Sequence, residues 1–148
     1  MRSTAALSVV AVAAIAATAP GAAAQTPLAV PDVVAVLQFS TPGASTTFKR
    51  FELRGVPEGA TVVVRCLTKS GKRCGGKLRK TFKKEDASGT VAVKRFVDRK
   101  IKAGRRLEAE ISHPSYFTKF KTLTVRRDRR PTITTECAKP GSEKRTDC

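Results

Sequence analysis

Residues 60–76 read ATVVVRCLTKSGKRCGG and contain an extended segment, a short loop and two cysteines. In the extended segment, Val62, Val64 and Cys66 alternate with Val63 and Arg65, so they share one face of a strand. Such alternation is typical of a β-strand that is buried on one side. The stretch therefore predicts a core strand that ends near a cysteine, and a Lys/Gly/Ser loop that leads to a second cysteine.

The segments on either side have similar patterns. The most regular is RLEAEIS at residues 106–112, where Leu107, Ala109 and Ile111 share one face. Further strands are expected at residues 33–39, 46–54, 77–83, 90–97 and 119–126. Turns are expected at residues 56–59 (VPEG), where Pro presets φ and Gly accepts a positive φ, and at the polar residues 84–89.

About seven short strands at roughly ten-residue spacing predict an all-β fold of the immunoglobulin-like β-sandwich kind. The buried tryptophan of that fold is missing, because the chain contains no Trp. A small closed β-barrel is the alternative, since the same strands can also form one.

The first 24 residues have the layout of a secretory signal peptide. Arg2 precedes an uncharged apolar run at residues 5–19, Pro20 and Gly21 end the run, and three alanines precede Gln25. An N-terminal transmembrane anchor is the alternative, but the alanine-rich run is short for a bilayer core of about 30 Å. We expect a signal peptide at 1–24, a flexible leader at 25–32, a sandwich domain at 33–126 and an irregular, basic, disulfide-clipped tail at 127–148.

The cysteines agree with export. Four cysteines allow three pairings, and the local pairing joins Cys66 to Cys74 and Cys137 to Cys148. We predict this pairing, because disulfides form and persist in oxidising compartments. No metal site and no cofactor are expected, since the chain has one histidine and no C-x-x-C pair.

The net charge is the feature with the widest functional consequence. The chain of 148 residues carries 29 Lys and Arg against 12 Asp and Glu, a formal net charge of +17. A surface of this charge attracts polyanions in a salt-dependent way. The candidate polyanion-binding residues are aromatic and basic side chains near the last expected strand: Tyr116, Phe117, Lys119, Lys121, Arg126, Arg127, Arg129 and Arg130. The alternative is that the aromatic residues belong to the core and the lysines to the solvated face.

No catalytic residue is predicted. His113, the single histidine, precedes Pro114 at a strand end, and no motif links it to a nucleophile, so a turn residue is the simpler reading. Glu108 and Glu110 share a strand face, as a glycosidase pair can, but acids among Lys and Arg on an outer face are more often ion partners.

Part of the chain also resembles a known kind of small module. The run from Gly55 through Pro57, Gly59 and Val62 to Cys66, with the Cys, Pro and Gly residues of the tail, is similar to a small basic β-sandwich module. Modules of that kind recur in exported proteins of actinobacteria, and the resemblance spans residues 51–148. It implies a fold and an exported setting and no catalytic residue. The chain departs from the module at Ser115-Tyr116, where Gly-Tyr is typical.

The sequence thus predicts a secreted or envelope-associated, non-catalytic structural or adhesion module. Its expected partners are anionic cell-wall polymers or acidic polysaccharides, without specific nucleic-acid recognition, because no nucleic-acid-binding motif is present. No transmembrane anchor is expected in the mature chain. The alternative is a secreted inhibitor or small enzyme that acts through the Cys66 to Cys74 loop, in which Lys72 and Arg73 suit a trypsin-like pocket.

Overall fold

The computed structural model describes residues 28–148, and the predicted signal peptide lies outside the described residues. Within this range the chain is all-β, and its only helical segments are the 3-10 turns η1 and η2. In chain order the elements are β1 (Val34–Ser40), β2 (Ser45–Leu67), η1 (Gly76–Leu78), β3 (Phe82–Ala92), η2 (Lys94–Phe96), β4 (Lys100–Lys102), β5 (Arg106–Ser112), β6 (Thr118–Arg126), β7 (Arg129–Ala138) and β8 (Thr146–Asp147).

The eight strands form one antiparallel sheet in the order β1-β2-β5-β6-β7-β8, with β3 and β4 also paired to β2. β2 is the central strand. Its first half pairs with β1 and its second half with β5. β3 pairs with both halves, from Glu52 to Val64. β1 therefore lies at one end of the strand order and the β7–β8 region at the other.

β2 runs without interruption through residues 56–59, where a turn was predicted. The glycines of this segment do have positive φ, 77° at Gly55 and 79° at Gly59, but they bend the strand instead of ending it. The register against β3 shifts three times between Leu53 and Val62, as at β-bulges. The prediction of a polar turn at residues 84–89 is wrong for the same reason, because these residues belong to β3 and follow the bend.

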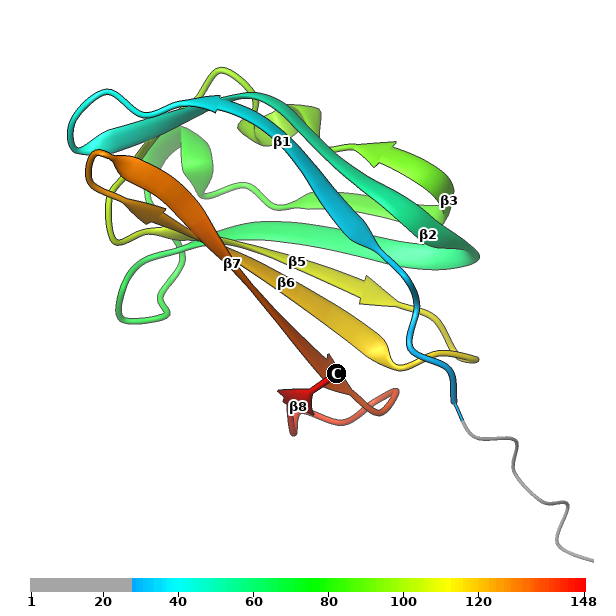
Figure 1. Ribbon diagram of the computed structural model, residues 1–148. Helices are drawn as coiled ribbons and strands as arrows, with labels where there is room; N and C mark the ends of the chain where they lie inside the picture. Colours follow the sequence, from blue (N-terminus) through cyan, green and yellow to red (C-terminus); the bar gives the residue numbers. More distant parts are fainter. Residues whose placement is uncertain (1–27) are drawn as a thin grey trace, which may run out of the picture.

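The bend folds the sheet over, so that its two halves face each other across one core. In Figure 1, β1 and β3 lie above the layer formed by β5, β6 and β7. Phe51 and Leu53 from the first half of β2 are in one hydrophobic cluster with Val62 and Val64 from the second half. The predicted inward faces of residues 62–66 and 106–112 are confirmed by the burial of Val62, Val64, Cys66, Leu107, Ala109 and Ile111.

Two predicted strand segments are partly 3-10 turns. Residues 77–83 were expected to be extended, but η1 covers their start and β3 begins only at Phe82. Residues 90–97 leave the sheet after Ala92 and form η2, which buries Phe96 completely. In both cases a 3-10 turn buries one apolar side chain in the core, Leu78 in η1 and Phe96 in η2. The spacing of these residues in the sequence is therefore similar to that of a strand.

Residues 129–138 form β7, where an irregular tail was expected. Pro131 does not stop the strand, because the pairing of β6 with β7 is irregular between Thr124 and Arg126, opposite the proline. Proline is tolerated at such bulges and on edge strands. Ile133, Thr135 and Cys137 then pair with Leu123, Lys121 and Lys119 of β6, so the tail extends the sheet.

Both predicted disulfides are confirmed. Cys66–Cys74 closes the loop after β2, and both its cysteines are buried. Cys137–Cys148 joins β7 to the end of the chain beside the two-residue strand β8. The first disulfide therefore belongs to the core, and the second one holds a terminal segment.

We expect Gly55→Ala to lower the free energy of unfolding by about 3 kcal/mol, because a positive φ strains alanine and the new Cβ would lie 2.2 Å from the backbone oxygen of Asp32. Gly43→Ala is the matched control. Its φ is also positive, but nothing lies within 4 Å of the new Cβ, so the loss should be about 1 kcal/mol. Urea unfolding measures both. Equal losses would contradict a special role for the contact between Gly55 and Asp32.

Replacing both Cys66 and Cys74 by alanine should lower the free energy of unfolding by about 2.5 kcal/mol, the chain-entropy value for a loop of this length. The same change at Cys137 and Cys148 should cost only about 1 kcal/mol, since a terminal segment can detach before the core unfolds. Urea unfolding of the two double variants gives the comparison. A larger loss for the terminal pair would contradict this assignment.

Candidate functional site

Four loops meet at one end of the folded sheet, on the left in Figure 1. They are the turn 41–44, the loop 68–74, the turn 103–105 and the hairpin turn around Asp128. The Asp128 N–H donates to the Gly43 carbonyl at 2.9 Å, and the Gly104 N–H donates to the Val125 carbonyl at 2.9 Å. Backbone hydrogen bonds thus join the hairpin to both turns, and the antiparallel topology brings together segments that are far apart in sequence.

This end of the molecule is strongly basic. Its loops carry eight Lys and Arg residues, which are Lys69, Lys72, Arg73, Arg105, Arg126, Arg127, Arg129 and Arg130. Asp128 is the one acidic residue in the same loops. We call this set of eight side chains the basic end. All of them except the half-buried Arg105 are exposed.

The arginine hairpin is the densest part of the basic end. Arg126 of β6 pairs with Arg129 of β7, and Asp128 in the turn between them has a positive φ of 50°. Within the described residues none of the hairpin arginines forms an ion pair. Their guanidinium groups therefore remain available for bidentate hydrogen bonds to phosphate or carboxylate oxygens.

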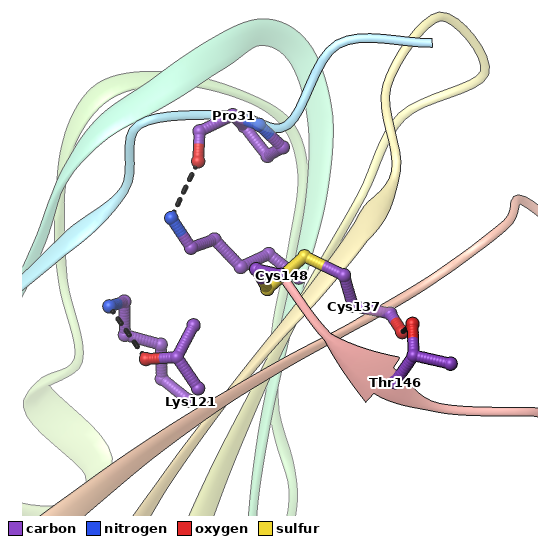
Figure 2. Close-up of a disulfide and its surroundings, with 7 residues drawn as sticks. Pro31, Lys121, Cys137, Thr146 and Cys148 are labelled. Carbon is purple, nitrogen blue, oxygen red and sulfur yellow. Dashed lines mark hydrogen bonds between the residues drawn. A yellow bond between two sulfur atoms is a disulfide. The ribbon is translucent and has the colours of Figure 1, made fainter.

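The structure does not bring Lys119 and Lys121 to the basic end. They lie near the start of β6, and Lys119 is about 23 Å along the strand from Arg126 at the usual rise per residue. Lys119 is 8% exposed, and its ammonium donates to the Pro31 carbonyl at 2.7 Å. Lys121 also points inward and donates to the Thr135 hydroxyl at 3.2 Å (Figure 2). These two lysines face the inside of the folded sheet.

The environment of Lys121 disfavours its charged form. Partial burial lowers the pKa of its ammonium, and the neighbouring charge of Lys119 lowers it further. Asp32 acts in the opposite direction but more weakly. Lys121 is therefore a cation held in the interior without a close carboxylate partner among the described residues.

The candidate aromatic residues Tyr116 and Phe117, with Phe120 near them in sequence, lie at the opposite end of β6 from the arginine hairpin. Tyr116 contacts His113 edge to face, with ring centroids 5.1 Å apart. The backbone N–H of Phe117 donates to the Ala29 carbonyl, which fixes the segment before β1 to the start of β6. Phe120 is buried under the guanidinium of Arg145, whose carbon lies 3.8 Å from the ring centroid. The arginine hairpin and the aromatic residues are thus separate features.

The two glutamates of β5 are ion partners on the outer face of the sheet. Glu108 is 7% exposed and lies between two guanidinium groups, at 3.4 Å from Arg65 and 2.8 Å from Arg145. Glu110 pairs with Arg65 alone. The hydrogen bond and charge of Glu108 raise the pKa of Arg145 above its ordinary value. The network is structural, because both carboxylates are paired with guanidinium groups.

His113 lies beside a hollow of about 210 Å³, lined also by Gly59, Thr61, Ser112 and Thr118. Its Nδ1 accepts a hydrogen bond from the Ser115 N–H at 3.0 Å, which closes the turn after β5. No carboxylate hydrogen-bonds to His113 within residues 28–148. In the same range no three His, Cys, Asp or Glu side chains gather as a metal site.

The Cys66 to Cys74 loop is a tight hairpin. The Thr68 N–H donates to the Lys72 carbonyl at 2.7 Å, and the Gly71 N–H donates back to the Thr68 carbonyl at 3.0 Å. The Arg73 side chain bonds to the hydroxyl of Thr81. The loop therefore presents Lys69 and Lys72 on a turned backbone and not on an extended one.

The sequence indicated the hairpin arginines as polyanion-binding residues, but it did not place Lys69, Lys72, Arg73 and Arg105 at the same end of the sheet. The order of the strands could have placed these residues, because successive connections in an antiparallel sheet lie alternately at its two ends. Counting the connections, however, requires correct strand boundaries. The missed bend in β2 hid the fact that its end lies beside the start of β5.

Comparison with protein-family models, with curated protein sequences and with solved structures found no match. No helix in the described part of the chain has the length and apolar character needed to cross a membrane. The function is therefore inferred from the surface of the protein.

We expect Glu108→Gln to lower the free energy of unfolding by about 2 kcal/mol, since it leaves two partly buried guanidinium groups without their shared carboxylate. Glu110→Gln, on the same face and with a more exposed side chain, should cost less than about 1 kcal/mol. Urea unfolding of the two variants tests the difference. Equal effects would mean that the outer-face network is no stronger than ordinary surface ion pairs.

Proposed function

We propose that the protein is an exported, non-catalytic module of the cell envelope, and that its basic end binds anionic polymers. The observation that carries this proposal is that the loops at one end of the sheet contain eight Lys and Arg residues and a single aspartate. Such a concentration of like charge is unfavourable for the isolated fold, and a polyanion would neutralise it. Arginine in particular favours phosphate and carboxylate groups, which it can bind with two parallel hydrogen bonds.

Export is supported by two features. The first 24 residues have the order of a signal peptide, a basic residue, an apolar run and small residues. All four cysteines are paired in disulfides, which persist outside the reducing cytosol. We further propose that the folded sheet is an immunoglobulin-like β-sandwich, in which the bend of β2 connects two facing layers.

The inhibitor alternative has no comparable observation in its favour. Inhibitory loops insert an extended segment into a protease, whereas residues 68–72 are closed by two short hydrogen bonds across a turn. Arg73, one of the two residues suited to a trypsin-like pocket, is tied to Thr81. We therefore assign the charges of this loop to the basic end.

The decisive variant replaces Arg126, Arg127 and Arg129 by glutamine. Binding to purified bacterial cell wall at low salt should weaken by about 2 kcal/mol, or roughly thirtyfold, since each exposed ion contact contributes up to about 1 kcal/mol. A sedimentation assay with cell wall measures this affinity. Raising the salt concentration to about 0.5 M should remove most binding of the unaltered protein, because the Debye length falls to a few ångströms.

The matched control removes the same charge elsewhere, through Lys84→Gln, Lys139→Gln and Lys144→Gln. These lysines are exposed, form no ion pair among the described residues and lie outside the four loops. The control should retain cell-wall affinity within about threefold, as expected for a change in net charge alone. An equal loss in both variants would refute the basic end as the binding site. No wall binding at low salt would refute the proposed function itself.

A further inference from the structure

A cleft of about 540 Å³ separates β1 from β7, the two strands on the open side of the folded sheet. Ala35, Leu37 and Phe39 line it from β1, and Pro131 and Ile133 line it from β7. Both strands lie on the same side of the molecule in Figure 1, with the end of β1 near the start of β7. The two strands therefore run antiparallel along the cleft, and no strand of residues 28–148 lies between them.

The free edge of β1 lacks the protection that soluble proteins usually give to an edge strand. Its sequence, VAVLQFS, contains no charge and no proline, although the chain is rich in Lys and Arg. Edge strands are normally blocked by such residues, because unpaired N–H and C=O groups otherwise recruit another strand. β7, in contrast, is protected by Pro131 and by Arg129 and Arg130. The open hydrogen-bonding edge is thus that of β1.

Apolar side chains remain exposed beside this edge. Val34 is 52% exposed and Ile133 is 44% exposed, and they are two of the three large hydrophobic residues with high exposure in the described chain. Ala35, Leu37 and Phe39 pack only partly against the core. An inserted strand with apolar residues at alternate positions would cover the inward-facing members of this set.

The charges around the cleft indicate which charge its ligand should carry. Arg130 lines the cleft near Phe39. Beyond Ile133, Thr135 of β7 accepts the hydrogen bond of the inward-pointing Lys121. Neither cation forms an ion pair in residues 28–148, and Asp32 is the acid that acts on Lys121. The lining of the cleft is therefore apolar apart from the unpaired Arg130, and the net positive charge of the chain also favours an acidic ligand.

We propose that the cleft between β1 and β7 binds an extended, acidic peptide segment of a partner protein as an added strand on β1. Strand addition uses the free backbone groups of the edge for affinity and alternate side-chain positions for specificity. A second copy of this chain fits less well, since β7 walls the space opposite β1 and a net charge of +17 on each copy opposes association. This site is distinct from polymer binding at the basic end, although Arg130 borders both.

The probe is a fluorescein-labelled heptapeptide with capped ends, in which valine alternates with glutamate. Its affinity is measured by fluorescence anisotropy with the full mature chain, and hydrogen exchange reports the amides of β1. We expect saturable binding and slower exchange along β1. A peptide of the same sequence with N-methyl groups on alternate residues keeps charge and apolar surface but cannot pair as a strand, so it should not bind.

Two variants of the same charge locate the site. Ile133→Glu places a carboxylate in the cleft and should weaken peptide binding by at least about tenfold, because like charges at an interface are strongly unfavourable. Thr132→Glu adds the same charge to the opposite face of β7 and should change the affinity less than about twofold. Both positions are exposed, so both variants should fold, and urea unfolding checks this.

Several results would overturn the proposal. Equal binding of the N-methylated peptide would mean that attraction is electrostatic and not strand addition. Equal weakening by the two variants would place the peptide elsewhere on the basic surface. Protection of β1 that grows with protein concentration in the absence of peptide would identify a second copy as the occupant. Cell-wall binding is measured separately with the arginine variant. Failure of the peptide proposal therefore leaves the test of cell-wall binding unaffected, and the reverse also holds.

Discussion

The bend in β2 is the constraint on which the rest of the structure depends. At Gly55 the backbone passes so close to the Asp32 carbonyl that a Cβ would stand 2.2 Å from its oxygen. Only glycine permits both this approach and the positive φ. The bend lets one strand serve both halves of the sheet, with β3 following it, and it places Leu53 and Val64 in the same core. Without the bend the two halves of the sheet could not cover each other, and the apolar residues of one face would remain in water.

The same bend separates the molecule into regions with different surfaces. Connections on one side collect at the basic end, where the Asp128–Gly43 hydrogen bond ties the arginine hairpin to the first turn. On the open side the fold stops short of closure, and β1 and β7 face each other across a cleft. The outer face, by contrast, is occupied by an ion network centred on Glu108. The basic end concentrates unpaired charge, and the cleft borders the free backbone edge of β1.

Charge and disulfides have complementary roles in this arrangement. A strongly cationic chain of this size repels itself, and the Cys66–Cys74 disulfide holds a lysine-rich loop against the core despite that repulsion. The inward lysines show the limit of the rule that charged side chains face the solvent. Lys119 occupies an inward position because its long side chain reaches the Pro31 carbonyl, which fastens the segment before β1 to β6. A charged residue at a core position thus anchors backbone instead of marking a surface.

The sequence by itself determined the all-β class, the inward faces at residues 62–66 and 106–112, and both disulfides. These features are local, since the two-residue period and short cysteine spacings need no partner strand to be read. Only the tertiary structure decided that residues 56–59 bend a continuous strand, that 129–138 extend the sheet, and that the Lys119 ammonium bonds to the Pro31 carbonyl. Each of these depends on which backbone groups find partners far away in the chain, and a pattern along one strand contains no information about the strand that will pair with it.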